Sequence, residues 1–118
     1  MKLGRILLGT LLLTVAVPDP ITLNLWKLRL TKRCGDCHLF GARLTKADLS
    51  GADLRNADLR WAHLTSVNLE GADLRGANLR NARLNDVTLK NANLCGATLM
   101  DAVKSSVGCQ NLSATGNQ

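Results

Sequence analysis

Aromatic side chains are scarce in this chain of 118 residues, which has two tryptophans, one phenylalanine and no tyrosine. A core of packed rings is therefore excluded, and aliphatic groups must supply the buried surface. Long apolar runs are also missing, since the run over residues 6–17 is shorter than the roughly 20 residues that cross a bilayer. The chain has no nucleotide-binding loop, hydrolase elbow or catalytic-triad spacing, so the familiar enzyme signatures are absent.

Acidic residues are outnumbered by basic ones. Fifteen Lys and Arg residues against nine Asp and Glu give a formal net charge of +6. Without residues 1–16, thirteen basic and nine acidic residues remain, and over residues 37–111 the balance is nine to seven. The chain is therefore one small domain without a strongly acidic surface, and part of its positive excess lies in residues 27–33.

Leucine, in contrast, recurs at every fifth position. In an α-helix a step of five residues turns about 140° net, so these leucines do not line one face. In a strand an odd step sends alternate leucines to opposite faces. A chain that turns once per five residues and stacks its turns is the remaining solution, which predicts a solenoid. Thirteen consecutive leucines keep the interval: Leu39, Leu44, Leu49, Leu54, Leu59, Leu64, Leu69, Leu74, Leu79, Leu84, Leu89, Leu94 and Leu99.

The other positions of the five-residue unit also have a fixed character. Two residues before each leucine stands Cys37, one of ten alanines, Val67 or Val87, and we expect this small group to face a narrow interior beside the leucine. The remaining three positions are polar or turn-forming and are expected to face solvent. The last of them holds mainly Gly or Asn, which suit tight turns.

These residues resemble a known family. The run Ala-Asp-Leu-Ser-Gly-Ala-Asp-Leu-Arg-Asn-Ala-Asp-Leu over residues 47–59 resembles the A(D/N)Lxx signature of pentapeptide-repeat proteins, and the similarity extends over about residues 37–101. The resemblance implies an all-β fold, a right-handed quadrilateral β-helix with four pentapeptides per coil. Thirteen repeats then give about three coils, a short stack.

The two ends of such a stack need caps, because each end otherwise exposes a leucine layer. Residues 17–36 are expected to form a linker and a short N-terminal capping helix near Leu23 to Lys32, which contains Leu25, Trp26, Leu28 and Leu30. This helix is too short to be stable alone, so packing on the first coil must hold it. The β-helix is assigned to residues 37–106, where Lys104 already breaks the leucine pattern. Residues 107–118 are expected to form a C-terminal tail. From Asn111 onward its residues are small and polar, and we expect this part to be disordered.

The first sixteen residues differ in kind from the repeats. Lys2 and Arg5 precede a short apolar run, and Thr14-Val15-Ala16 provides small residues at its end. This pattern predicts a secretory signal peptide over residues 1–16, cleaved after Ala16, with a retained N-terminal anchor as the alternative. We therefore expect export, to a periplasm or a thylakoid lumen, where disulfides are stable.

Four cysteines, Cys34, Cys37, Cys95 and Cys109, form two local pairs in the sequence. Both segments resemble those of exported cyanobacterial and chloroplast-lumen pentapeptide proteins, and this resemblance implies disulfides, with Cys95 and Cys109 pinning the last segment to the final coil. Cys34, Cys37 and His38 also have the residue types of a zinc site, but no fourth ligand is evident. A redox role for Cys34 and Cys37 is a further alternative.

Stacking at an interval of twenty residues predicts columns of side chains on the surface. Arg43, His63 and Arg83 share one column, a basic face suited to an anionic partner. Phe40 and Arg60 share a neighbouring column. Trp61 takes a corner position whose equivalents are Gly41 and Asn81. Phe40, Arg60 and Trp61 are therefore candidate partner-contact residues, together with the basic column.

The preferred function is that of a non-enzymatic exported scaffold or protein-binding module. The aspartates before the leucines take the position that the family uses for turn hydrogen bonds, so none is assigned to acid–base catalysis. We expect no cofactor, another protein as the partner, no nucleic acid, no membrane contact after signal removal, and a monomer. The alternative of a DNA-mimicking topoisomerase modulator, known in the family, is disfavoured by the basic charge and the short stack.

Overall fold

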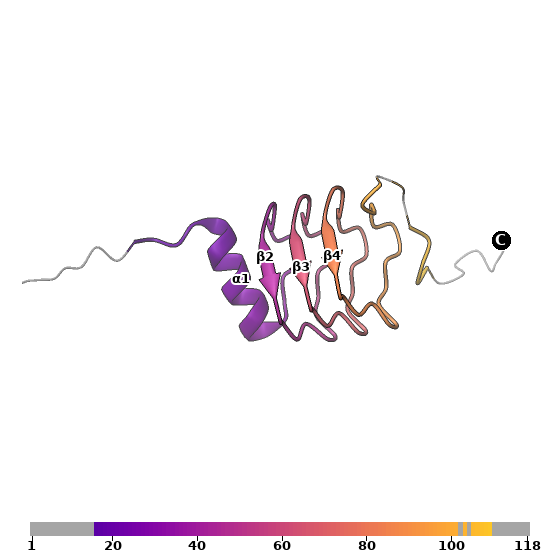
Figure 1. The fold of residues 1–118 in the computed structure, drawn as a ribbon, viewed down its shortest axis with the longest axis horizontal. Helices are drawn as coiled ribbons and strands as arrows, with labels where there is room; N and C mark the ends of the chain where they lie inside the picture. The colour runs from indigo at the N-terminus through magenta and orange to yellow at the C-terminus, as the bar shows by residue number, and fades with distance from the viewer. Residues whose placement is uncertain (1–15, 102, 104, 110–118) are drawn as a thin grey trace, which may run out of the picture.

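A computed structural model describes residues 16–101, 103 and 105–109. The chain forms a stack of square coils with one helix across the N-terminal end (Figure 1). Most of the expected signal peptide, Lys104 and the tail from residue 110 lie outside the described residues. The named elements are α1 (Pro20–Thr31), β2 (Arg43–Thr45), β3 (His63–Thr65) and β4 (Arg83–Asn85).

The three strands stack in parallel on one face of the coils, in the order β2-β3-β4. Leu44 pairs with Leu64, and Leu64 with Leu84, so the register between neighbouring coils is twenty residues. The other three faces carry isolated parallel bridges at the same interval, such as Asp48 with Asn68 and Asp58 with Asn78. The predicted right-handed quadrilateral β-helix is confirmed.

Each corner of the coil places one residue in the left-handed region of the backbone. Along residues 39–42, Gly41 has φ of 69°, and the Leu39 carbonyl accepts a hydrogen bond of 3.0 Å from the Ala42 N–H, as in a type II turn. The same positive φ recurs at every fifth residue from Asp36 to Gly96, and it includes Trp61 at 62°. The five-residue period therefore reflects a positive φ at every corner, whereas the turn hydrogen bond is absent at Lys46, Ser66 and Asp86, the corners that follow β2, β3 and β4.

The core consists of the leucines and the small residues that precede them, as expected. Leu39, Leu64 and Leu74 are at most 1% exposed, and the alanine layer packs between the leucine rows. Burial weakens toward the C-terminal end, where Leu84 and Leu89 are only partly buried. The cause is geometric, because no further coil covers these leucines within the described residues.

Helix α1 closes the N-terminal end of the core. The Asp19 side chain caps it by accepting a 2.8 Å hydrogen bond from the Thr22 N–H, and proline takes the first position. Leu28 is fully buried, and Ile21 and Leu25 pack beside it. A hydrogen bond of 3.0 Å from Asn24 Nδ2 to the His38 carbonyl ties the helix to the first coil.

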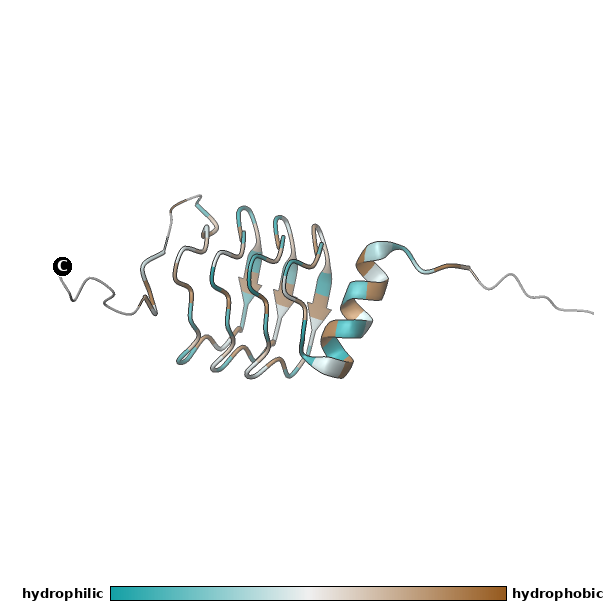
Figure 2. Cartoon of the chain, turned by 180° about the vertical axis from the view of Figure 1, so that it is seen from behind, coloured by the Kyte–Doolittle hydropathy of each residue, from teal (hydrophilic) through white to brown (hydrophobic). Residues whose placement is uncertain are grey.

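The opposite side of α1 does not take part in this packing. Trp26 and Leu30 are 65% and 77% exposed, and Leu23 is 58% exposed. Figure 2 shows brown, hydrophobic segments alternating with teal ones along α1 and along the coils. The reason is the helical period, because residues 23, 26 and 30 lie about 160° from residues 21, 25 and 28. No helix in the described part of the chain is long and apolar enough to cross a membrane.

The coils begin and end differently from the expected 37–106. Arg33 already pairs with Asp53, because Cys34 occupies an inward leucine position one repeat earlier. At the other end the chain reverses. Leu94 and Gly96 donate backbone hydrogen bonds to the Val107 and Ser105 carbonyls. Residues 103 and 105–109 thus run antiparallel to the last coil instead of adding another parallel turn. We call them the return segment.

Candidate functional site

One corner of the stack brings the predicted contact residues together. Phe40 precedes the first corner glycine, and Arg60 takes the equivalent position one coil later. The Arg60 guanidinium carbon lies 5.3 Å from the centre of the Phe40 ring, within cation–π range. Two hydrogen bonds of 2.7 Å from Arg60 to the Asp58 carboxylate hold the guanidinium in place. Phe40 is nevertheless 46% exposed, so an aromatic edge remains open to solvent.

Trp61 stands at the corner itself, directly after Arg60. Its φ of 62° is unusual for a bulky side chain, and the left-handed region raises the energy of such a residue by roughly 1–2 kcal/mol. The equivalent positions hold Gly41 and Asn81, which tolerate this conformation well. The indole is 53% exposed, so burial does not offset the backbone strain. Strain at an exposed aromatic residue is typical of a position kept for contact.

The basic column begins two residues beyond this corner. Arg43, His63 and Arg83 are the first residues of β2, β3 and β4, and they pair in register. Arg43 and Arg83 are exposed and His63 is half-buried. Only Ala62 separates Trp61 from His63, so the basic column lies on the face that begins at this corner. We call this surface, made of Phe40, Arg60, Trp61, Arg43, His63 and Arg83, the corner patch.

Another face carries paired aspartates and arginines. Arg55 donates two hydrogen bonds to Asp53, at 2.8 and 2.7 Å, and Arg75 pairs with Asp73 in the same way one coil later. The hydrogen bonds from Arg55 lower the pKa of Asp53 to about 2, and the Arg75 hydrogen bond lowers that of Asp73. These carboxylates therefore stay ionised and are unsuited to act as general acids.

The same aspartates also stabilise the turns. Asp48, Asp53 and Asp58 each accept a hydrogen bond from the backbone N–H two residues later, at 3.0 to 3.2 Å. Asn68 and Asn78 do the same on other repeats. An amide and a carboxylate are interchangeable for this purpose, which explains the Asp/Asn alternation before the leucines.

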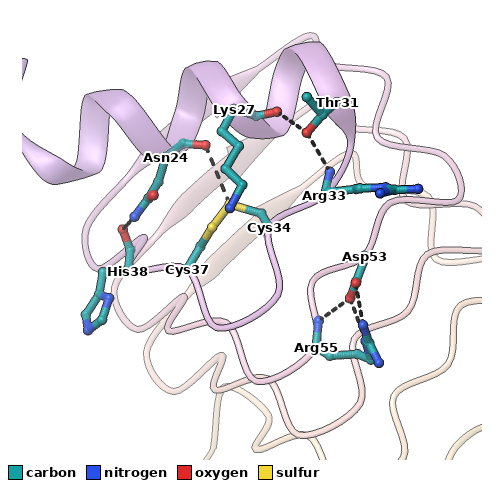
Figure 3. The surroundings of a disulfide bond; sticks show 9 residues. All are labelled: Asn24, Lys27, Thr31, Arg33, Cys34, Cys37, His38, Asp53 and Arg55. Carbon is teal, nitrogen blue, oxygen red and sulfur yellow. Dashed lines mark hydrogen bonds and ion pairs between the residues drawn. A yellow bond between two sulfur atoms is a disulfide. The ribbon is translucent and has the colours of Figure 1, made fainter.

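The first cysteine pair lies beneath α1 (Figure 3). Cys34 and Cys37 form a disulfide and are 0% and 5% exposed. Both side chains occupy inward positions, Cys34 that of a leucine and Cys37 that of an alanine. A buried, bonded pair leaves no sulfur accessible to a substrate while α1 is in place. The described residues contain no group of three or more His, Cys, Asp or Glu side chains placed to hold a metal ion.

The second pair, Cys95 and Cys109, joins the last coil to the return segment. Cys95 follows Leu94 at an outward position, so this disulfide lies outside the core. Gly108 precedes Cys109 with φ of 83°, and a Cβ there would approach Asn93 Cα to 2.9 Å. The bridge and the glycine together hold the return segment close to the coil.

Sequence reasoning missed the exposed side of α1. Leu23, Trp26 and Leu30 form a second apolar stripe, opposite to the stripe that covers the core. The signal was available in the spacing, since positions i, i+3 and i+7 share a helix face. It was obscured because apolar and polar residues alternate along the helix, so the sequence shows no single apolar face.

Comparisons with known proteins agree with this architecture. The family model described as "Pentapeptide repeats" matches residues 33–71 and 62–101. No curated protein matches the sequence. HetL, a pentapeptide repeat protein involved in heterocyst differentiation regulation from the cyanobacterium Nostoc sp. strain PCC 7120, is 30% identical with a TM-score of 0.50, over 66% of this chain and 46% of that chain.

A second solved structure is a pentapeptide repeat protein from the thylakoid lumen of Arabidopsis thaliana. It is 39% identical with a TM-score of 0.40, over 60% of this chain and 46% of that chain. This chain thus spans less than half the length of either protein. The family match covers more than half of the 118 residues and coincides with the observed coils, so the chain belongs to the pentapeptide-repeat family.

Proposed function

We propose that this chain is an exported, non-enzymatic scaffold that binds another protein through the corner patch. The observation that carries the proposal is Trp61, a large aromatic side chain that is half exposed at a corner where the backbone favours glycine. Phe40 adds a second exposed ring, fixed by Arg60. The partner therefore offers an apolar pocket for the indole, the side-chain type enriched among interface hot spots.

The charge around the patch indicates the chemistry of the partner. Arg43 and Arg83 are exposed, and no ion pair involves either of them in the described part of the chain. A partner surface with carboxylates opposite β2, β3 and β4 complements this column, which favours binding and speeds association. We propose that the chain meets this partner as a monomer, without nucleic acid or cofactor.

Export is supported by the sequence and by the cysteines. The basic start and apolar run before Ala16 have the form of a secretory signal, and both cysteine pairs are disulfides. A DNA-mimicking role has less support, because Asp53, Asp58 and Asp73 are each neutralised by an arginine. A redox role has less support because Cys34 and Cys37 are buried.

The test is affinity capture from the native compartment with wild-type chain, Trp61→Gly and Asn81→Gly. Trp61→Gly removes the indole and relieves the backbone strain, so we expect this variant to unfold at the same or a higher temperature. Its affinity for the partner should fall tenfold or more, which corresponds to roughly 1.4 kcal/mol per tenfold. Asn81→Gly makes the equivalent backbone change without removing an aromatic group and should retain the partner. Equal capture by all three chains would contradict the proposal.

A further inference from the structure

The exposed side of α1 is an apolar surface without a partner in the described structure. Leu23, Trp26 and Leu30 are 58%, 65% and 77% exposed, and Val17, just before the helix, is 90% exposed. A surface helix normally turns one apolar stripe inward and a polar face outward. Helix α1 has an inward stripe on the core and this second stripe toward solvent. A helix with two apolar sides is typical of an element that is covered on both.

The charge of this region limits which kind of partner can cover the exposed side of α1. Residues 16–35 contain four basic side chains, Lys27, Arg29, Lys32 and Arg33, and a single acidic one, Asp19 at the helix start. Lys27 is exposed, lies one helical turn from Leu23 and Leu30, and forms no ion pair in the described part of the chain. A second copy would bring like charges together, so self-association through α1 is disfavoured.

The direction of the chain gives an independent argument. Residues 16–19 lead away from the coils at this end of the stack, opposite the end that carries the return segment (Figure 1). Ala16 and Pro18 line a shallow apolar groove together with Leu23 and Trp26. The fifteen residues before Ala16 include the apolar run that begins at Ile6. The exposed stripe therefore follows, in the sequence, the segment that meets the membrane if the chain is exported as proposed above.

We propose that the outward side of α1 rests on a lipid bilayer that contains anionic headgroups. Leu23, Trp26 and Leu30 enter the boundary between headgroups and acyl chains, and Lys27 pairs with phosphate at the surface. Tryptophan suits this boundary, because its ring is apolar and its N–H is polar. The stack then stands on the membrane by its N-terminal end. This surface departs from the sequence-based expectation of no membrane contact, and it is separate from the corner patch.

The two tryptophans make the proposal testable in the full chain. Trp61→Phe leaves Trp26 as the only indole, and Trp26→Phe leaves Trp61. Each variant is mixed with vesicles of phosphatidylcholine alone or with phosphatidylglycerol added. We expect the emission of Trp26 to shift to shorter wavelength and to lose iodide quenching with the anionic vesicles, whereas Trp61 keeps its emission and quenching. Trp26 that stays accessible to iodide, or equal shifts at both positions, would overturn the proposal.

Vesicle sedimentation separates α1 from residues 1–15, which carry an apolar run of their own. We expect Leu30→Ser to weaken partitioning about tenfold and Lys27→Gln about fivefold. The matched changes Val103→Ser and Lys90→Gln, at the other end of the stack, should leave it unchanged. Unaltered partitioning of Leu30→Ser and Lys27→Gln would assign all binding to residues 1–15 and refute the proposal. Trp26 shielded from iodide before vesicles are added would refute it too, because another part of the chain or a second copy would then cover α1.

Discussion

At the scale of single residues, each position of the five-residue unit does one structural task. The leucine fills the interior, the small residue lets the coil close around it, the Asp or Asn stabilises the turn, and the corner residue accepts a positive φ. These tasks were predictable, because twenty-residue stacking places like residues above one another. Trp61 is the clear exception, since its side chain suits none of them. Such a local mismatch is where function is expected.

The leucine column of β2, β3 and β4 offers a graded test of core packing. Leu64 is 1% exposed with coils on both sides, whereas Leu84 is only partly buried. We expect Leu64→Ala to lower the free energy of unfolding by about 3 kcal/mol, since it leaves a closed cavity. Leu84→Ala should lower it by less, because the C-terminal end is already partly open. Denaturant unfolding measures both, and equal losses would contradict the observed burial gradient.

The aspartate–arginine pairs predict a dependence of stability on pH. The pKa of Asp53 is about 2 in the folded chain, below the ordinary value of 3.8. A depressed carboxylate pKa stabilises the fold above pH 4, and this contribution is lost as the pH falls toward 2. Because the pair is largely exposed, its share is at most about 1 kcal/mol.

Arg55→Gln removes the main cause of that low pKa. We expect this variant to lose less stability than the wild type between about pH 4 and pH 2, measured by thermal unfolding across the range. Arg43→Gln is the matched control, because Arg43 forms no ion pair in the described structure and should leave the slope unchanged. An Arg55→Gln slope equal to that of the wild type would show that the pair contributes nothing.

At the scale of elements, the coils were predictable and the two caps only in part. The repeat predicts where Leu39 to Leu99 point, but it does not specify what covers the first and last layers. Helix α1 was expected from its apolar residues, yet its two apolar sides were not distinguished. The reversal after residue 101 was not predicted, because it follows from backbone hydrogen bonds and from the close approach of Gly108 to Asn93, neither of which repeats in the sequence.

Two glycines test the return segment against an ordinary corner. A Cβ at Gly108 would lie 2.9 Å from Asn93 Cα, and its φ is 83°. A Cβ at Gly51 meets nothing within 4 Å, at φ of 67°. Both alanine variants bear the left-handed backbone penalty of about 1 kcal/mol. Gly108→Ala should in addition loosen the return segment, seen as faster hydrogen exchange at the Leu94 and Gly96 amides. Equal exchange in the two variants would contradict this.

At the scale of the whole molecule, the coils are repeated units joined mainly to their neighbours. Most hydrogen bonds between coils join residues nineteen or twenty-one positions apart, as the Leu39 amide bonds to the Asp58 carbonyl and the Asp73 amide to the Ala52 carbonyl. Stability should therefore grow with each coil added, provided that both caps keep their register. The fold class was accessible from the sequence for this reason, whereas the partner was not, since surface contacts do not obey the repeat.

Duplicating residues 53–72 tests this organisation. The insertion adds one complete coil with four more leucines, so α1 and the return segment keep their orientation around the stack. We expect a higher midpoint of thermal unfolding and a steeper denaturant dependence, because more apolar surface is buried. Inserting only residues 53–57 turns the C-terminal cap by one face and should lower the midpoint. Equal midpoints for the two insertions would contradict the square-coil register.

A stack of parallel coils does not end by itself, because its last coil exposes the same unpaired N–H and C=O groups with which each earlier coil pairs. The end of an amyloid fibril binds its next subunit in the same way. The chain reversal near the C terminus removes that template. The carbonyls of Val103, Ser105 and Val107 accept hydrogen bonds from amides of the last coil, and the chain runs antiparallel to that coil. These amides are therefore not available to pair with a parallel coil from another molecule. The Cys95–Cys109 disulfide ties this blocking segment covalently to the last coil, so the C-terminal rim stays covered even when its hydrogen bonds open transiently.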